Sequence, residues 1–228
     1  MEETYLKVYT LDLTNLELND TILGLLSEER RERIRHAVTP YDAKQIAYSK
    51  LLLRYMVTQT GLGIGSPRDV TKTRSGKPIA NTPGLYFNTA HEGHYVVGAI
   101  SNAGDVGIDI REEDPFLFEK RLTEQWTKNE AFDKCIGVGK KGPKTMTIDR
   151  DTVFYHGELY FLSFYEEPKG YMTCACVRGA DPEAERINVS STDMESFLYS
   201  LSSERWEKKS ARLQERKNLT RGIYFCYN

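Results

Sequence analysis

The segment VGIDIREED, at residues 106–114, has the residue types of a cation site. Apolar residues lead into Asp109, and a carboxylate at the end of a strand is a common ligand for a divalent cation that prefers oxygen. Side chains alternate along a strand, so Arg111 should share the face of Asp109, and its guanidinium cannot bind a metal. The segment is therefore open to three interpretations: a metal site, a metal site with one ligand replaced by a cation, or a solvated turn.

Three further segments carry ionisable side chains near turns or on a helix face: SGKP at 75–78, FNTAHEG at 87–93 and WTKNEAFDK at 126–134. Each has a simple structural explanation when it is considered alone. Lys77 lies in a Gly-Lys-Pro sequence that suits a turn before a strand, and His91 follows a strand and suits the surface. Glu130 and Lys134 form an i,i+4 pair, and such pairs are usually solvated. Asp109 could equally cap a turn.

Hydrophobic periodicity and capping residues indicate an α+β fold that would position these segments. The clearest helix has Thr39 as N-cap, Pro40 at its first position, Asp42 three residues after the cap and Gly61 at its end. The other expected elements are a strand in 5–18, a helix at 27–38, two strands in 85–110, a helix at 116–136, strands at 146–154, 158–166 and 171–178, a helix at 192–217 and a strand at 222–227.

This order predicts two similar lobes, residues 1–105 and 106–228, related by a pseudo-twofold. Each lobe should pack a long helix on a small, mostly antiparallel sheet. The sequence shows no repeat strong enough to prove a duplication.

The composition limits the classes of partner. The chain has 31 basic and 33 acidic side chains, so bulk attraction to nucleic acid is not expected. No apolar run approaches the ~20 residues that span a bilayer, and the first residues do not resemble a signal peptide. The four cysteines lack the spacing of a zinc site and suit reduced, buried thiols. We therefore expect a cytoplasmic protein, and a monomer, with no membrane or nucleic-acid partner.

Taken together, the four segments resemble a known family in their order and spacing. Members of the larger, two-lobed 4′-phosphopantetheinyl transferases, the type that serves surfactin synthetase, show G-K-P, F-N-x-S-H-S, G-[IV]-D-x-E and W-[ST]-x-K-E-[AS]-x-x-K in this order. The corresponding segments here are GKP at 76–78, FNTAHE at 87–92, GIDIR at 107–111 and WTKNEAFDK at 126–134. The similarity extends over residues 5–178, and the segment from 180 onwards has no match.

The resemblance implies a Mg²⁺-dependent transfer of the phosphopantetheine arm of coenzyme A to a serine of an acyl or peptidyl carrier protein. Adenosine 3′,5′-bisphosphate would be the second product. Asp109 and Glu130 would hold the metal and, with Lys134, carry the catalytic step, with Glu130 accepting the serine proton. The residues implied in binding coenzyme A are Arg30, Arg33, Lys77, Pro78, His91 and Arg111. The carrier could belong to fatty acid, polyketide or nonribosomal peptide biosynthesis.

The chain also departs from the family pattern. The departures are Arg111 in place of the second acid, Asn129 in place of a lysine, Ala90 and Glu92 beside the histidine, Gln45 at a basic position, and a short segment between residues 109 and 126. Arg111 could contact a phosphate or could pair with Glu130 and disable the site. The alternative function is therefore a regulatory or interaction protein that binds coenzyme A on the same fold, with weak or lost transferase activity. The helix at 192–217 could pack on the second lobe and present a basic end to the carrier, or its end could simply be solvated.

Overall fold

The computed structural model describes residues 3–61, 70–73, 77–80, 82–113, 117–138, 151–179 and 183–203. The helices in this part of the chain are α1 (Asp20–Gly24), α2 (Glu28–Arg35), α3 (Pro40–Gln59) and α4 (Leu117–Ile136), and residues 191–203 are also helical. The strands are β1 (Leu6–Asp12), β2 (Val70–Lys72), β3 (Pro78–Ala80), β4 (Tyr86–Glu92), β5 (Tyr95–Ser101), β6 (Val106–Glu112), β7 (Thr152–Tyr155), β8 (Glu158–Tyr165), β9 (Tyr171–Arg178) and β10 (Ala184–Val189).

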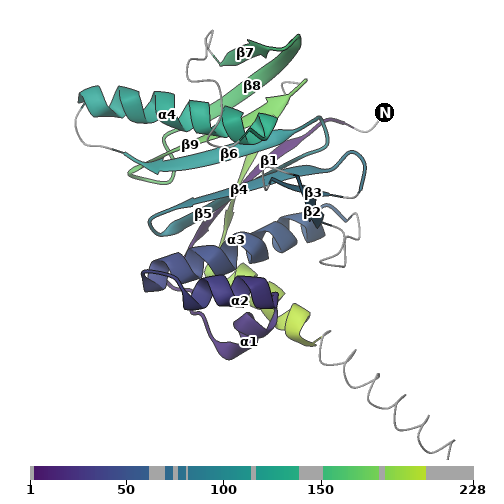
Figure 1. Ribbon diagram of the computed structural model, residues 1–228, viewed down its shortest axis with the longest axis vertical. Coiled ribbons are helices and arrows are strands. Elements are labelled where there is room, and N and C mark those ends of the chain that lie inside the picture. The colour runs from purple at the N-terminus through teal and green to yellow at the C-terminus, as the bar shows by residue number, and fades with distance from the viewer. Residues whose placement is uncertain are drawn as a thin grey trace, which may run out of the picture.

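Two four-stranded sheets form the centre of the molecule, and one long helix covers the outer face of each (Figure 1). The first sheet has the order β10-β1-β5-β4 and packs on α3, and the second has the order β6-β9-β8-β7 and packs on α4. A third apolar cluster lies between the sheets and joins Leu6 and Val97 of the first to Ile108 and Val177 of the second. The result is a four-layered α+β structure of two lobes, which confirms the predicted fold class.

Local sequence signals explain how α3 begins and ends. The Thr39 hydroxyl accepts a hydrogen bond from the Asp42 amide, and the Asp42 carboxylate accepts one from the Thr39 amide, which completes a capping box with Pro40 in the first turn. Gly61 follows the last turn with φ +69°, a conformation that favours glycine. The apolar face of α3 then buries residues such as Leu51 against the first sheet.

The contact between α4 and β6 is close because Gly107 has no side chain. A Cβ atom added to Gly107 would lie 2.1 Å from the carbonyl oxygen of Ala131 and 2.4 Å from the backbone nitrogen of Cys135. Val106, Ile108 and Ile110, on the other face of β6, face the first sheet. Residues 107, 109 and 111 therefore face α4, as alternation along the strand requires.

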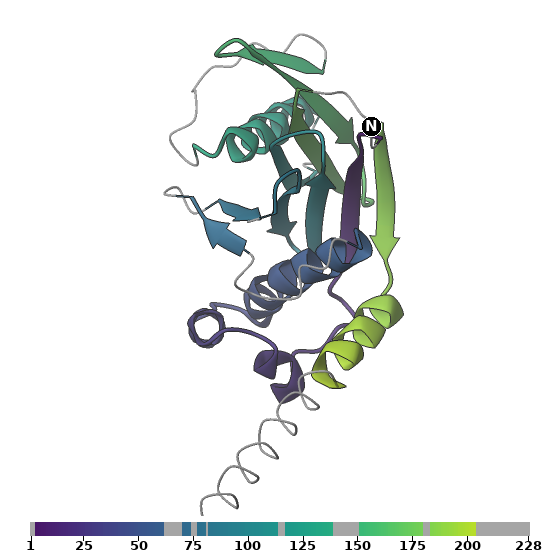
Figure 2. The same ribbon diagram turned by 90° about the vertical axis from the view of Figure 1, so that its right-hand side faces the viewer.

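The C-terminal part of the described chain corrects the predicted lobe boundary. Strand β10 pairs in parallel with β1, from Leu6 with Ala184 to Leu11 with Val189, so it extends the first sheet rather than the second (Figure 2). The helix at 191–203 buries Met194 and Leu198 in the core of the first lobe. The assignment of residues 106–228 to the second lobe is therefore wrong for this segment, and so is the idea that this helix packs on the second lobe.

Residues 85–110 form three strands, β4, β5 and β6, instead of the two that were predicted, because the chain turns at Gly93. Other predicted elements agree with the structure where it describes them. Strands β8 and β9 correspond to the strands expected at 158–166 and 171–178. The strand expected at 146–154 is described only from residue 151, as β7. The end of the last helix and the strand expected at 222–227 lie outside the described residues. In the part of the chain that is described, no helix has the length and apolar character needed to cross a membrane.

Candidate functional site

Asp109 is the buried centre of a group of charged side chains between β6 and α4. It lies on β6 with 3% of its surface exposed. The Lys134 ammonium, on α4, donates to its Oδ1 at 2.5 Å, and the Arg111 Nε donates to its Oδ2 at 3.2 Å. Both oxygens of this carboxylate therefore face a protein cation. A buried carboxylate needs such partners, because an unpaired buried charge is costly.

The Arg111 guanidinium is held from several sides. One of its terminal nitrogens lies 3.8 Å from the Glu92 carboxylate, at the end of β4, and its Cζ lies 5.7 Å from the centre of the Trp126 ring on α4. A guanidinium over an indole face is attracted by the ring electrons. Arg111 thus connects β6, β4 and α4, with about a third of its side chain exposed. In this structure its carboxylate partners are Asp109 and Glu92.

His91 lies at the meeting point of four elements. Burial lowers the pKa of His91 below 6.5, and the charges of Lys134 and Arg33 lower it further, while Asp42 and Asp109 oppose the shift. The residue retains exposed surface and has these four charged groups as electrostatic neighbours. His91 is therefore mainly neutral near pH 7, and an arriving anion would favour its charged form.

The turn after His91 is fixed by residues that the sequence prediction did not include. The Gln45 side-chain amide, buried in α3, donates to the carbonyl oxygen of Gly93 at 2.8 Å. Gly93 has φ +52°, and a Cβ atom there would lie 2.2 Å from the hydroxyl oxygen of Tyr171. The position at which the family has a basic residue thus serves here to anchor the turn that carries His91.

Asn88 joins the two lobes beneath the site. It is buried in β4, and its side-chain carbonyl accepts a hydrogen bond from the backbone amide of Ile108 on β6 at 3.4 Å. The bond crosses the junction between the two sheets, three residues before His91 on β4 and one residue before Asp109 on β6. Asparagine is depleted in strands, and its presence directly after Phe87 was the available signal for this role.

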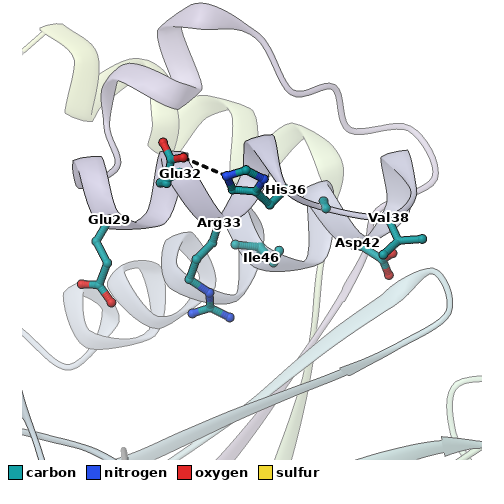
Figure 3. Close-up of a pocket in the computed structure, with 8 residues that line it drawn as sticks. Glu29, Glu32, Arg33, His36, Val38, Asp42 and Ile46 are labelled. Atoms are coloured by element: carbon teal, nitrogen blue, oxygen red, sulfur yellow. Dashed lines mark hydrogen bonds and ion pairs between the residues drawn. The ribbon is translucent and has the colours of Figure 1, made fainter.

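A pocket of about 630 Å³ lies beside the site, at the corner of α2 and α3. Its lining residues are Glu29, Glu32, Arg33, His36, Ala37, Val38, Asp42 and Ile46. Figure 3 shows the Arg33 guanidinium extending away from α2, whereas His36 turns toward Glu32. Two of the lining residues, Arg33 and Asp42, are electrostatic neighbours of His91. A volume of this size is typical of small-molecule sites.

The two arginines predicted on α2 have different surroundings. Arg30 donates to the carbonyl oxygen of Ile46 at 2.7 Å, and burial together with the charge of Arg33 lowers the pKa of Arg30. Arg30 therefore ties α2 to α3, and Arg33 lines the pocket. Phosphate binding by Arg30 and Arg33 remains a prediction.

Lys77 lies near the end of α4, away from Asp109. The Lys77 ammonium contacts Asp105 Oδ1 at 3.0 Å and the carbonyl oxygen of Cys135 at 2.6 Å, with 10% of its side chain exposed. Pro78 begins β3. Lys77 thus binds the start of β3 to the end of α4, one residue beyond Lys134. A role in binding phosphate stays a prediction for Lys77 and Pro78.

Glu130 shares a face of α4 with Lys134, since residues four apart are neighbours on a helix. Lys134 contacts Asp109, so this face points toward β6. Burial and the charge of Glu130 raise the pKa of Asp133, in the next turn, to about 6. Among the described residues, no three His, Cys, Asp or Glu side chains form a group that could hold a metal. The sharing of one magnesium by Asp109 and Glu130 therefore remains a proposal.

Comparison with known proteins gives consistent matches. Residues 16–103 match the sequence model of a family described as 4′-phosphopantetheinyl transferase, N-terminal. The chain is 24% identical over 201 residues to the 4′-phosphopantetheinyl transferase ffp of Bacillus subtilis and 28% identical over 201 residues to the 4′-phosphopantetheinyl transferase Sfp of the same species. Each of these two matches covers 72% of this chain and 88% of the relative.

A vertebrate protein matches over a smaller share. The L-aminoadipate-semialdehyde dehydrogenase-phosphopantetheinyl transferase of Xenopus laevis is 26% identical over 189 residues, which cover 61% of each chain. At low identity, the chain is thus similar to 4′-phosphopantetheinyl transferases of bacteria and vertebrates.

Proposed function

We propose that this protein transfers the 4′-phosphopantetheine arm of coenzyme A to a serine of an acyl or peptidyl carrier protein and releases adenosine 3′,5′-bisphosphate. The observation that carries the proposal is the row of cationic or protonatable side chains that leads from the pocket to the buried carboxylate: Arg33, His91, Lys134 and Arg111 around Asp109. A long anion with phosphates at two places suits such a row. The names of the matched relatives support the same reaction.

The row of charges suggests how coenzyme A would lie. The 3′-phosphate would bind near Arg33 in the pocket, with Arg30 supporting α2, because arginine suits bidentate contact with phosphate. The pyrophosphate would then reach His91, Lys134 and Arg111. Lys77 and Pro78 would support the other side of the ligand, although Lys77 also bonds Asp105 and α4.

In the reaction, the serine oxygen forms a bond to the phosphorus atom that bears the pantetheine arm. The bond from this phosphorus to the bridging oxygen breaks, and the bisphosphate leaves with the electron pair. Glu130 would accept the serine proton, and Lys134 would neutralise charge on the phosphate oxygens. Such transfers depend more on alignment and charge stabilisation than on covalent help from the protein.

Asp109 and Glu130 are the residues that we propose as magnesium ligands. Their oxygen-only donor chemistry fits a hard cation, which commonly takes one or two carboxylates, phosphate oxygens and water. Glu130 lies one turn of α4 before Lys134, whose ammonium contacts Asp109, and this spacing supports the proposal. When bound, magnesium would supply charge neutralisation at the pyrophosphate. We extend the proposal to a monomer acting in the cytoplasm, which agrees with the free thiols of Cys135, Cys174 and Cys176.

A second function has one observation in its favour. Both Asp109 oxygens pair with protein cations, so Arg111 stands where it can compete with a metal. A protein that binds coenzyme A for regulation or interaction, with weak or lost transfer, would have the same fold and the same pocket.

The two functions are distinguished by mass spectrometry. The protein is incubated with coenzyme A, Mg²⁺ and several apo carrier proteins, and the expected result is a carrier that gains the mass of one phosphopantetheine. Asp109→Ala should abolish the gain, whereas Asp20→Ala, which removes an exposed acid on α1, should preserve it. Measurable binding of coenzyme A without any mass gain would favour the second function.

A further inference from the structure

Arg111 takes up a position at which it can serve the site as a cation in its own right. It stands two residues after Asp109 on the same face of β6, so its guanidinium reaches the space in front of the buried carboxylate. Its Nε lies 3.2 Å from Asp109 Oδ2, and the Trp126 ring covers it at 5.7 Å. The guanidinium is thus fixed before any ligand arrives.

The carboxylate at the centre of the site is already balanced without a metal. Lys134 faces one oxygen of Asp109 at 2.5 Å, and Arg111 faces the other. A divalent cation arriving at Asp109 would meet two positive charges and would have to displace one of them from an oxygen. An anion arriving at the same place would meet two positive charges that the protein holds in position.

Glu92 keeps the guanidinium partly neutralised until an anion is present. Its carboxylate lies 3.8 Å from Arg111, longer than a hydrogen bond, so this pair is loose compared with the Asp109 pair. A phosphate can therefore compete with Glu92 for the outer nitrogens of Arg111, while Asp109 retains the Nε. Arginine offers five donors in one plane, which permits a carboxylate and a phosphate to bind at once.

We infer that Arg111 is the resident cation for the pyrophosphate, so that coenzyme A binds this protein with little dependence on Mg²⁺. The inference rests on the proposed function for the identity of the ligand, and it concerns binding rather than the transfer step. It assigns to Arg111 a role that a carboxylate at position 111 could not fill, since a carboxylate would repel the pyrophosphate unless a metal stood between them.

The test is the affinity for coenzyme A, measured by isothermal titration calorimetry in excess EDTA and in excess MgCl₂. For the unaltered protein, the dissociation constant should change by less than about threefold between the two buffers. For Arg111→Glu, affinity in EDTA should fall at least tenfold, and Mg²⁺ should recover much of it. For Arg111→Gln, which retains hydrogen-bond donors without charge, affinity in EDTA should fall by a similar factor, so the inference does not depend on the folding of one variant.

Arg121→Glu is the matched control, because it makes the same charge change at an exposed position of α4. It should leave both affinities within twofold of the unaltered protein. Binding by the unaltered protein that depends on Mg²⁺ as strongly as binding by Arg111→Glu would overturn the inference and leave the proposed function in place. An absence of coenzyme A binding in both buffers would overturn the proposed function, and the inference with it.

Discussion

Replacing Gly107 by alanine should separate α4 from β6 and thereby disturb the site without removing any charged group. The added Cβ would lie 2.1 Å from the Ala131 carbonyl oxygen and 2.4 Å from the Cys135 nitrogen, and both are backbone atoms of α4. Non-bonded heavy atoms pack about 3.5 Å apart, so the helix has to retreat by roughly 1 Å. Lys134 lies on this part of the helix, so its contact with Asp109 would lengthen with the retreat.

The expected cost follows from known overpacking. Inserting a methyl group into a packed interior typically destabilises by about 1–3 kcal/mol, and here the obstacle is backbone, so the upper half of that range applies. For a chain of this size each kcal/mol lowers the melting temperature by roughly 2–4 °C. Urea denaturation and thermal scans of the purified variant measure both quantities. Calorimetric titration with coenzyme A should also show a loss of affinity of several-fold.

Gly98→Ala is the control for this substitution. A Cβ at Gly98 would lie 2.4 Å from the Met56 sulfur and 2.8 Å from its terminal methyl carbon, both of which belong to a flexible side chain. The cost should be about 1 kcal/mol or less, with unchanged affinity for coenzyme A. If Gly107→Ala proved as stable as Gly98→Ala and bound coenzyme A equally well, the close packing of α4 on β6 could not be what positions Lys134.

Three other predictions test the surroundings of Asp109. Lys134→Gln leaves this buried carboxylate with one cation instead of two, so the free energy of unfolding at pH 7 should fall by about 2 kcal/mol. Urea denaturation at two salt concentrations would measure the change. An unchanged free energy of unfolding would mean that Asp109 is not buried as described. Burial and Lys134 lower the pKa of His91 below 6.5, so the unfolded chain binds this proton more readily than the native one. The stability present above pH 6.5 should therefore be lost as the pH falls through the native pKa of His91, and His91→Gln should show a flatter dependence between pH 7 and 5; parallel curves for the two proteins would contradict this. Gln45→Leu removes the side-chain amide that donates to the Gly93 carbonyl oxygen. The free energy of unfolding, measured by urea denaturation, should fall by about 1–2 kcal/mol, and coenzyme A binding should weaken. Binding of coenzyme A as tight as in the unaltered protein would exclude a positioning role for Gln45.

Much of the fold could be predicted because its signals are local. The cap, first turn and end of α3 depend on Thr39, Pro40, Asp42 and Gly61, each of which acts within one turn of its own position. The nearly continuous apolar runs of β5 and β6 likewise indicate strands that are buried on both faces. Such features need no knowledge of distant contacts.

The placement of the C-terminal segment could not be predicted in this way. The sequence of β10, AERINV, has weak alternation, and its parallel pairing with β1 joins residues 184–189 to residues 6–11 across almost the whole described chain. Strands that pair in parallel are not joined by a short turn, so the local sequence contains no turn signal for this pairing. Met194 and Leu198 are four residues apart and share one face of their helix, but such an apolar face does not specify which lobe it covers.

The candidate site was partly predictable for the same reason. Spacing on a strand predicted that Asp109 and Arg111 share a face, and the contact between them agrees. Spacing on a helix predicted that Glu130 and Lys134 share another face, and Lys134 contacts Asp109. The anchoring of the turn by Gln45 and the bond across the lobes from Asn88 depend on tertiary packing. The sequence marked these two positions only as departures or polar interruptions.

The exchange of an acid for Arg111 separates two requirements that a metal usually meets together. Holding an anionic ligand needs fixed positive charge near its phosphates, and Arg111 with Lys134 provides that charge at Asp109 without any ion. Stabilising the charge that develops during transfer needs a cation placed at the reacting oxygens, and a guanidinium tied to Asp109, Glu92 and Trp126 cannot move to follow them. A protein of this design should therefore bind coenzyme A in the absence of magnesium and still require magnesium for turnover, because binding and transfer place their demands on different atoms of the same site.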